Sequence, residues 1–319
     1  MKDPVTEIGG FIQLDRYMLP MLYQNEIALN CGRNCLRWIV EKKHITKLLM
    51  PHFLCDTAWE TCGNVSIRFY SIGEDLLPTD LYPNTDEWIY LVNYYGQLDP
   101  SLIAEYICRY GKVIVDNTQG YFDKPVEGAY TIYSCRKYFG VPDGAFLVCQ
   151  DDDLRKGYED LPKSSSSDHM HFLLGRLEHG ANLHYSEYVE NNKRFHNAPV
   201  ERMSALTDNL LHGIDYDFVR QRRTDNFVYL ASRLEDRNRL VLRNPNGAFA
   251  YPLWIENGAE VREKMIREKI YIPLLWPNVI SNMPDDSLEY DLALNILPLP
   301  CDQRYGKEEM EIICKTLDL

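Results

Sequence analysis

In residues 131–145, TIYSCRKYFGVPDGA, an apolar run leads to a lysine and then to a Gly/Pro-rich turn. This run and the next apolar run, residues 145–149, predict two buried β-strands with Lys137 on the connection between them. Lysine is normally a surface residue, because burying an unpaired charge is costly. Lys137 therefore has two interpretations: a turn residue whose amine reaches water, or a partly desolvated amine that attacks an aldehyde.

Strands and helices alternate on the N-terminal side of this stretch. Strands are expected at residues 26–30, 45–51, 65–70, 88–94 and 112–116, and helices from Gly32, over 56–62 and over 99–110. This alternation predicts a mostly parallel sheet flanked by helices, with a ligand site outside the carboxyl ends of the strands. Asn30, Asp116 and the Ser134–Lys137 segment all fall at such ends.

The C-terminal side has a different pattern. A polar loop over residues 151–168 precedes two long helical patterns, residues 169–191 and 203–234. Short strands at 240–243, 249–252 and 270–273 and helices at 259–269 and 307–317 follow. The sequence thus predicts an N-terminal arm (residues 1–24), a large domain (25–235) and a small C-terminal α/β domain (236–319).

The composition limits the classes of function. With 45% hydrophobic and 25% charged residues the chain is typical of a soluble globular protein, and its net charge of −13 argues against nucleic acid as the main partner. The nine cysteines lie mostly in apolar runs with no CxxC pair, so we expect reduced thiols, a cytoplasmic location and no metal. No apolar run has the length of a membrane span, so no membrane partner is expected.

Three features supply the parts of a site for pyridoxal 5′-phosphate (PLP). A helix that opens at Gly32 presents free backbone N–H groups and a positive dipole end, which suit a phosphate. Asp116 ends a strand, where a carboxylate can cap a helix or pair with a protonated pyridine nitrogen. Lys137 offers an amine for the aldehyde. Each feature alone is common, but the three in this order predict a PLP site.

At these segments the chain resembles the DegT/DnrJ/StrS-type sugar aminotransferases, which are PLP enzymes of fold type I. The segments that carry the resemblance are residues 28–36 (ALNCGRNCL), 93–97 (NYYGQ), 113–119 (VIVDNTQ) and 296–300 (ILPLP). The Ser134-x-x-Lys137 spacing is similar to a pattern of the wider fold type. Cys31 and Arg33 stand where the family usually has serine and threonine. The resemblance implies an aspartate-aminotransferase-like large domain with a small C-terminal α/β domain.

The resemblance also implies a role for each matching residue. Lys137 would hold PLP as an internal aldimine and move the proton during the reaction. Asp116 would bind the pyridine nitrogen, and Gln119 would lie against the ring and its 3′ oxygen. The remaining implied cofactor contacts are Gly32, Arg33, Ser134 and Asn192, and the implied substrate contacts are Lys193, Arg194 and, in a competing alignment, Arg202. The ring-stacking position falls on Leu54, with Phe53 adjacent.

The implied reaction transfers an amino group from a glutamate-like donor to a keto sugar, expected to be nucleotide-linked. The implied assembly is a homodimer with shared active sites, in which residues 192–194 reach the neighbouring subunit. Two alternatives remain open: a homologue that has lost catalysis and serves in binding or regulation, and a PLP-dependent sugar dehydratase. Lys137 speaks against the dehydratase, because family members of that type have histidine there.

Overall fold

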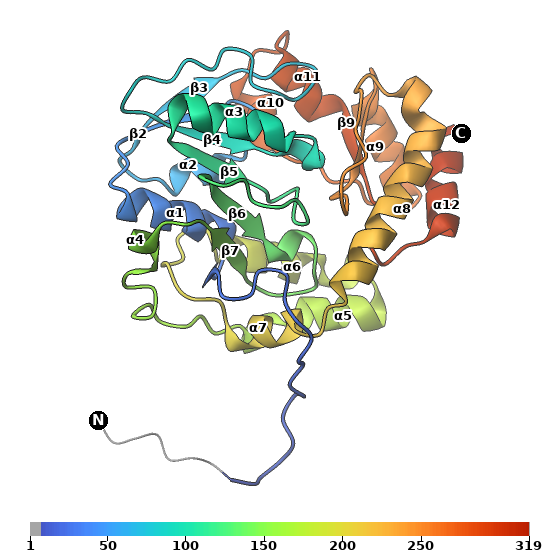
Figure 1. Ribbon diagram of the computed structural model, residues 1–319. Coiled ribbons are helices and arrows are strands. Elements are labelled where there is room, and N and C mark those ends of the chain that lie inside the picture. The colour runs from blue at the N-terminus through green and yellow to red at the C-terminus, as the bar shows by residue number, and fades with distance from the viewer. Residues whose placement is uncertain (1–7, 319) are drawn as a thin grey trace.

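The computed structural model describes residues 8–318 and is built on a seven-stranded sheet in the order β1-β7-β6-β5-β4-β2-β3 (Figure 1). Its strands are β1 (Ile27–Leu29), β2 (Lys47–Pro51), β3 (Ser66–Tyr70), β4 (Trp88–Val92), β5 (Val113–Asp116), β6 (Tyr130–Ser134) and β7 (Ala145–Val148). Strands β2 to β6 pair in parallel, whereas β7 is antiparallel to both β6 and β1. The short connection from β6 to β7 has no room for a crossover, so the chain must reverse there. The prediction of a mostly parallel sheet is confirmed.

The helices along the sheet follow the expected start and stop signals. They are α1 (Gly32–Lys42), α2 (Asp56–Glu60), the 3₁₀ turn η1 (Tyr94–Gly96), α3 (Pro100–Tyr110), the 3₁₀ turn η2 (Cys135–Lys137) and α4 (Asp152–Arg155). Helix α1 buries Cys35, Leu36 and Ile39 on one face, as its 3.6-residue pattern predicts. The Asp99 side chain caps α3, and Gly111 ends it with a left-handed φ of 74°.

The two long helices expected after residue 168 are wrong, because each is broken by a turn. The chain instead forms η3 (Ser167–His169), α5 (His171–His179), η4 (Asn182–His184), α6 (Tyr185–Lys193), α7 (Ala205–Leu211) and α8 (Tyr216–Leu234). Gly180, with a φ of 89°, ends α5. Between α7 and α8 the Asp215 side chain accepts the backbone N–H of Phe218 and starts a new helix. Apolar residues recur on both sides of these turns, so periodicity alone does not reveal them.

The C-terminal region pairs β8 (Tyr251–Trp254) with β9 (Ile296–Leu299) in antiparallel fashion. Its helices are η5 (Glu235–Arg237), α9 (Gly258–Arg267), α10 (Pro277–Asn282), α11 (Leu288–Asn295) and α12 (Lys307–Asp318). The strands expected at 240–243 and 270–273 are wrong, because neither segment has a strand to pair with. Instead, the Ile270 N–H bonds back to the Met265 carbonyl at 2.9 Å, closing the end of α9.

Two of the three hydrophobic cores in the described part of the chain take residues from both sides of the predicted domain boundary. The first fills the sheet and the helices that flank it, and it includes Trp254 and Ile296 from the C-terminal region. The second joins Phe227 and Leu230 of α8 to the β8–β9 pair and α12. Helix α8 crosses from α7 to α12 in Figure 1. The boundaries at residues 24 and 235 stay a prediction.

Among the described residues of the N-terminal segment, hydrogen bonds to the body begin at Asp15, whose carbonyl accepts from the Asn209 side chain at 2.9 Å. The backbone N–H of Tyr17 donates to Asn209 at 3.1 Å, and that of Leu19 to the His212 carbonyl at 2.9 Å. Residues 8–14 extend away from the body (Figure 1), and residues 1–7 of the predicted arm lie outside the described residues. None of the helices between residues 8 and 318 combines the length and apolar character needed to span a bilayer.

Candidate active site

The start of α1 meets the ends of β5 and β6. A Cβ built on Gly32 would lie 3.6 Å from Ile132 Cγ2, 3.9 Å from Ser134 Cβ and 3.9 Å from Thr118 Oγ1. Ser134 is the last residue of β6, and Thr118 follows the end of β5 by two residues. Lys137 ends the 3₁₀ turn that begins directly after Ser134. The three segments predicted from the sequence are therefore brought together at one edge of the sheet.

The N-terminus of α1 is suited to an anion. Cys31 occupies the cap position without a side-chain hydrogen bond, and the first turn contains no acidic residue. The Cys31 carbonyl accepts the N–H groups of Asn34 and Cys35, at 3.1 and 3.2 Å. The N–H groups of Gly32 and Arg33 precede any acceptor within the helix, and the helix dipole adds positive potential at this end. A phosphate group would meet both needs.

The side chains of Arg33, Arg136 and Arg194 add positive charge near the start of α1. The guanidinium carbons of Arg136 and Arg194 both lie 4.4 Å from the centre of the Phe195 ring, and Arg136 also donates to the Asn192 side chain. Desolvation lowers the pKa of Arg136 to about 10, and the neighbouring charges of Arg33 and Arg194 act in the same direction. Within residues 8–318 none of the three arginines forms an ion pair with a carboxylate. Partly buried cations without a countercharge are costly, so this arrangement favours binding of an anion.

Asp116 is held by two donors at the end of β5. The Tyr90 hydroxyl donates to Asp116 Oδ2 at 2.7 Å, and the backbone N–H of Thr118 donates to Oδ1 at 2.8 Å. Burial, and then the negative charge of Asp116, raises the pKa of Tyr90 well above its usual value, so this phenol keeps its proton. Tyr90 is not marked by any pattern in the sequence. Register explains the contact: Val92 pairs with Asp116, so Tyr90, two residues earlier, lies on the same face of the sheet.

Gln119 is buried, with 6% of its surface exposed, and its side-chain oxygen accepts the N–H of Tyr95 at 2.8 Å. Tyr95 has a left-handed φ of 53°, a conformation that most side chains avoid. The hydrogen bond therefore holds a strained turn between β4 and α3. The predicted contact of Gln119 with the cofactor ring stays a prediction.

Lys137 is exposed in the single chain, so the partial burial considered for it is not found. The turn η2 carries its side chain past the strand end, while Cys135 and Tyr138 on either side fill the core. Tyr188 of α6 lies close to it. Burial raises the pKa of Tyr188, but the charges of Lys137 and Arg136 and a hydrogen bond from Asn192 outweigh burial and lower it below the usual value. The Tyr188 phenol is therefore influenced by both of these positive charges.

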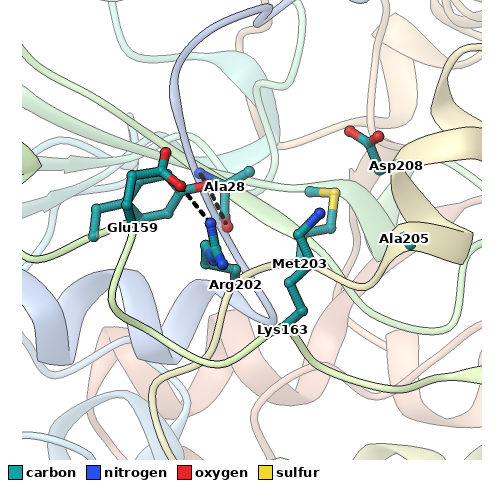
Figure 2. A pocket seen from close by; sticks show the side chains of 8 residues that line it. Ala28, Glu159, Lys163, Arg202, Met203, Ala205 and Asp208 are labelled. Atoms are coloured by element: carbon teal, nitrogen blue, oxygen red, sulfur yellow. Dashed lines mark hydrogen bonds and ion pairs between the residues drawn. The ribbon is translucent and has the colours of Figure 1, made fainter. Parts of the chain in front are cut away.

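The predicted cofactor contact Asn192 and the predicted substrate residues Lys193, Arg194 and Arg202 separate into two groups. Asn192 and Arg194 reach the Arg136–Lys137 segment, whereas Lys193 points to solvent and pairs with Glu190 at 2.8 Å. Arg202 binds the Glu159 carboxylate and the Leu161 carbonyl. It lines a cavity of about 250 Å³, together with Ala28, Tyr158, Glu159, Lys163, Met203, Ala205 and Asp208 (Figure 2). That cavity contains none of the strand-end residues, so substrate contacts by Lys193 and Arg202 stay predictions.

The two residues at the expected ring-stacking position are both buried. Phe53 is 1% exposed and Leu54 is 3% exposed. The Phe53 ring packs edge-on against Trp276, with the ring centres 4.5 Å apart, and against Tyr94 at 5.3 Å. Phe53 is therefore part of the core, and the stacking role of Leu54 stays a prediction.

Comparison with known proteins finds similarity in structure. No protein-family model matches the chain, and no curated protein sequence matches it. The chain is similar to the sugar aminotransferase CalS13 from Micromonospora echinospora, with a TM-score of 0.64 and 14% identity over 91% of this chain and 86% of that one. A DegT/DnrJ/EryC1/StrS aminotransferase from Brucella abortus gives a TM-score of 0.63 at 14% identity, over 91% and 84% of the chains.

NtdA from Bacillus subtilis, solved with its cofactor PMP (the amine form of PLP), gives a TM-score of 0.64 at 14% identity, over 91% of this chain and 72% of that one. These likenesses confirm the predicted fold, the aspartate-aminotransferase-like architecture of PLP fold type I, together with the resemblance in architecture to DegT-type sugar aminotransferases. At 14% identity they show the fold alone. What the chain does rests on its own residues.

Proposed function

We propose that this chain is a PLP-dependent aminotransferase in which the Lys137 amine bonds to the cofactor. The observation that carries the proposal is the approach of Gly32 to Ser134 and Thr118, because it places an anion-binding helix start between a strand-end carboxylate and the lysine segment. PLP, when bound, supplies an electron-accepting ring for reactions at the Cα atom of an amino acid.

The residues at the helix start fit the phosphate of the cofactor. The N–H groups of Gly32 and Arg33 and the hydroxyl of Ser134 supply donors, and Arg136 supplies charge. The DegT-type enzymes usually have serine and threonine at the positions of Cys31 and Arg33, so this chain lacks two hydroxyl groups there. The hydroxyl group of Thr118, a residue that no sequence pattern marked, lies near Gly32 and supplies one donor at this place.

Asp116 and Lys137 have separate proposed roles, one at the cofactor ring and one in proton transfer. Asp116, fixed by Tyr90 and Thr118, would hold the pyridine nitrogen of the cofactor in its protonated form. With PLP bound, Lys137 Nζ would be the group that takes up the Cα proton of the amino donor and gives it up again. Tyr188 and Asn192 lie near the Arg136–Lys137 segment.

For the substrates we propose a glutamate-like amino donor and a keto sugar that is linked to a nucleotide. The sugar is supported by the fold shared with sugar aminotransferases and by Arg194, whose charge faces the same site. The cytoplasm is the proposed location, in keeping with nine free cysteines.

A homodimer with shared sites is the proposed assembly. Its support is the exposed apolar surface on the segment beside Lys137, where Leu174, Leu177 and Leu183 are 52%, 85% and 72% exposed. A second copy of the chain would cover this surface and close the site around the exposed lysine.

An absorbance spectrum of the purified chain with PLP tests the proposal. We expect a visible band at roughly 410–430 nm from lysine-linked PLP, and its loss to the near ultraviolet when L-glutamate is added. Lys137→Ala should lack the band and lower amino transfer about 100-fold or more. Lys163→Ala, a lysine of the separate cavity, should behave as the parent chain.

The other results would select an alternative. No band at saturating PLP would leave a scaffold that serves in binding or regulation. A Lys137-dependent band that ignores every amino donor would point to a different PLP reaction, such as sugar dehydration.

A further inference from the structure

Histidines are concentrated in one segment of the chain. Five of the eight lie between residues 169 and 196, namely His169, His171, His179, His184 and His196. Two of them meet the same carboxylate in the structure: His171 opens α5, His184 ends η4, and Glu187 lies in the first turn of α6. One potential ligand atom from each of these three residues lies within 4.8 Å of the other two.

The spacing of these atoms suits a zinc ion. His171 Nδ1 lies 2.8 Å and His184 Nδ1 lies 3.4 Å from the same oxygen, Glu187 Oε2. Zinc holds nitrogen and oxygen ligands at about 2.0–2.2 Å, so two ligands of a tetrahedral site are about 3.4 Å apart. The distance from His184 Nδ1 to Glu187 Oε2 already has this value. A small outward movement of the exposed His171 side chain would lengthen the distance from its Nδ1 to the same oxygen to this value.

The fold fixes one ligand and leaves the others accessible. A Cβ on Gly175 would lie 2.2 Å from His184 Cε1, so the imidazole rests directly on the α5 backbone, and only glycine permits this. The His184 side chain is 11% exposed, whereas His171 and Glu187 are 75% and 39% exposed. An ion held here would be anchored on the buried imidazole and would face solvent on its other side.

The donor set also fits zinc. Two imidazoles with one carboxylate are ligands that zinc accepts in proteins.

We propose that His171, His184 and Glu187 bind one zinc-class divalent ion, with water as the fourth ligand. The ion joins α5, η4 and α6 into one unit and so holds Tyr188 and Asn192 against the Arg136–Lys137 segment. The expectation of no metal rested on the cysteines, which this site does not use. The proposal is independent of the aminotransferase function, since its three ligands take no part in cofactor binding.

Zinc titration of the tag-free, chelator-treated full chain tests the site, by equilibrium dialysis with and without PLP. We expect one ion per chain, and at least about tenfold weaker binding after His171→Ala or Glu187→Gln, since even outer-shell partners of a metal change affinity by this factor. His196→Ala, in the same region but outside the cluster, is the matched control. His171 is exposed, so its loss leaves the core intact, which circular dichroism checks.

A cobalt spectrum and hydrogen exchange complete the test. Bound Co²⁺ should show no thiolate charge-transfer band, and zinc should slow amide exchange over residues 171–193 in the parent chain and not in His171→Ala. Unchanged affinity in Glu187→Gln, a thiolate band, or less than one ion bound per chain at zinc concentrations well above the protein would each overturn the proposal.

Discussion

Two regions meet at Lys137, and they are held in different ways. The strand-end frame, which we define as the start of α1 together with the ends of β5 and β6, rests on fully buried side chains such as Ile114, Val115 and Ile132. The hairpin, defined as residues 171–193, exposes Leu177 and Leu183 by 85% and 72%. The hydrophobic core is sufficient to fix the positions of the side chains in the frame. The hairpin buries less apolar surface, so the hydrophobic effect stabilises its position less. Its position in the single chain relies on a few contacts, such as the buried Phe172 and the hydrogen bond between Arg136 and Asn192, and the proposed ion and second chain would add to them.

The turn before β7 shows how firmly the frame is built. Asp143 is fully buried and accepts the N–H and hydroxyl of Ser204, at 3.1 and 2.8 Å, and the hydroxyl of Thr207. Gly144 has a φ of 105°, and a Cβ there would lie 2.8 Å from Thr207 Cγ2. These contacts tie α7 to the connection that carries Lys137.

The largest expected effect on the free energy of unfolding is therefore in this turn, next to the frame. Asp143→Ala leaves three buried donors without their acceptor, and we expect the free energy of unfolding to fall by about 3 kcal/mol. Leu177→Ala, in the hairpin, should change it by less than about 0.5 kcal/mol. Urea denaturation of both variants gives the two values. Equal losses would show that the hairpin is as much a part of the cooperative core as the frame.

A smaller effect is expected where the two regions touch. Arg136→Met keeps an extended side chain near Phe195 but removes the charge proposed to face the phosphate. A charge-assisted hydrogen bond contributes about 1.5–3 kcal/mol, so PLP affinity should fall about 10- to 100-fold. Titration with PLP followed by fluorescence measures this. Pyridoxal without phosphate should bind both proteins alike, and Arg220→Met, in a surface pair with Asp217, should bind PLP normally. Equal loss for pyridoxal and PLP would remove Arg136 from the phosphate site.

A substitution in the hairpin itself is expected to have the smallest effect on the free energy of unfolding and the largest effect on dimer formation. Leu177→Asp should change the free energy of unfolding of the single chain by less than about 0.5 kcal/mol, because the side chain is already solvated. In the proposed dimer the new charge would be buried, so self-association should weaken. Sedimentation velocity measures the dimer fraction. Val241→Asp, at a fully exposed valine in the C-terminal region, is the control. A dimer that tolerates Leu177→Asp would mean that another surface forms it.

Much of the frame could be predicted from the sequence because its signals are local. Gly32 opens a helix whose buried face has a regular period, Asp116 ends an apolar run, and Ser134 and Lys137 follow another. The structure confirms these elements and brings them to one edge of the sheet. The errors occurred after residue 168, where short helices separated by turns keep an apolar pattern across each break.

The sequence alone predicts the alternation of strands and helices and the place of the lysine, because these depend on neighbours within a few residues, and the alternation in turn predicts a mostly parallel sheet. Contacts between distant segments are seen only in the folded chain: Tyr90 holds Asp116, Thr118 and Arg136 lie near the start of α1, Lys137 is exposed, and His171, His184 and Glu187 meet. The physical reason is register and packing: such contacts join residues from different strands and helices, and the pairing that aligns them leaves no pattern in either segment alone.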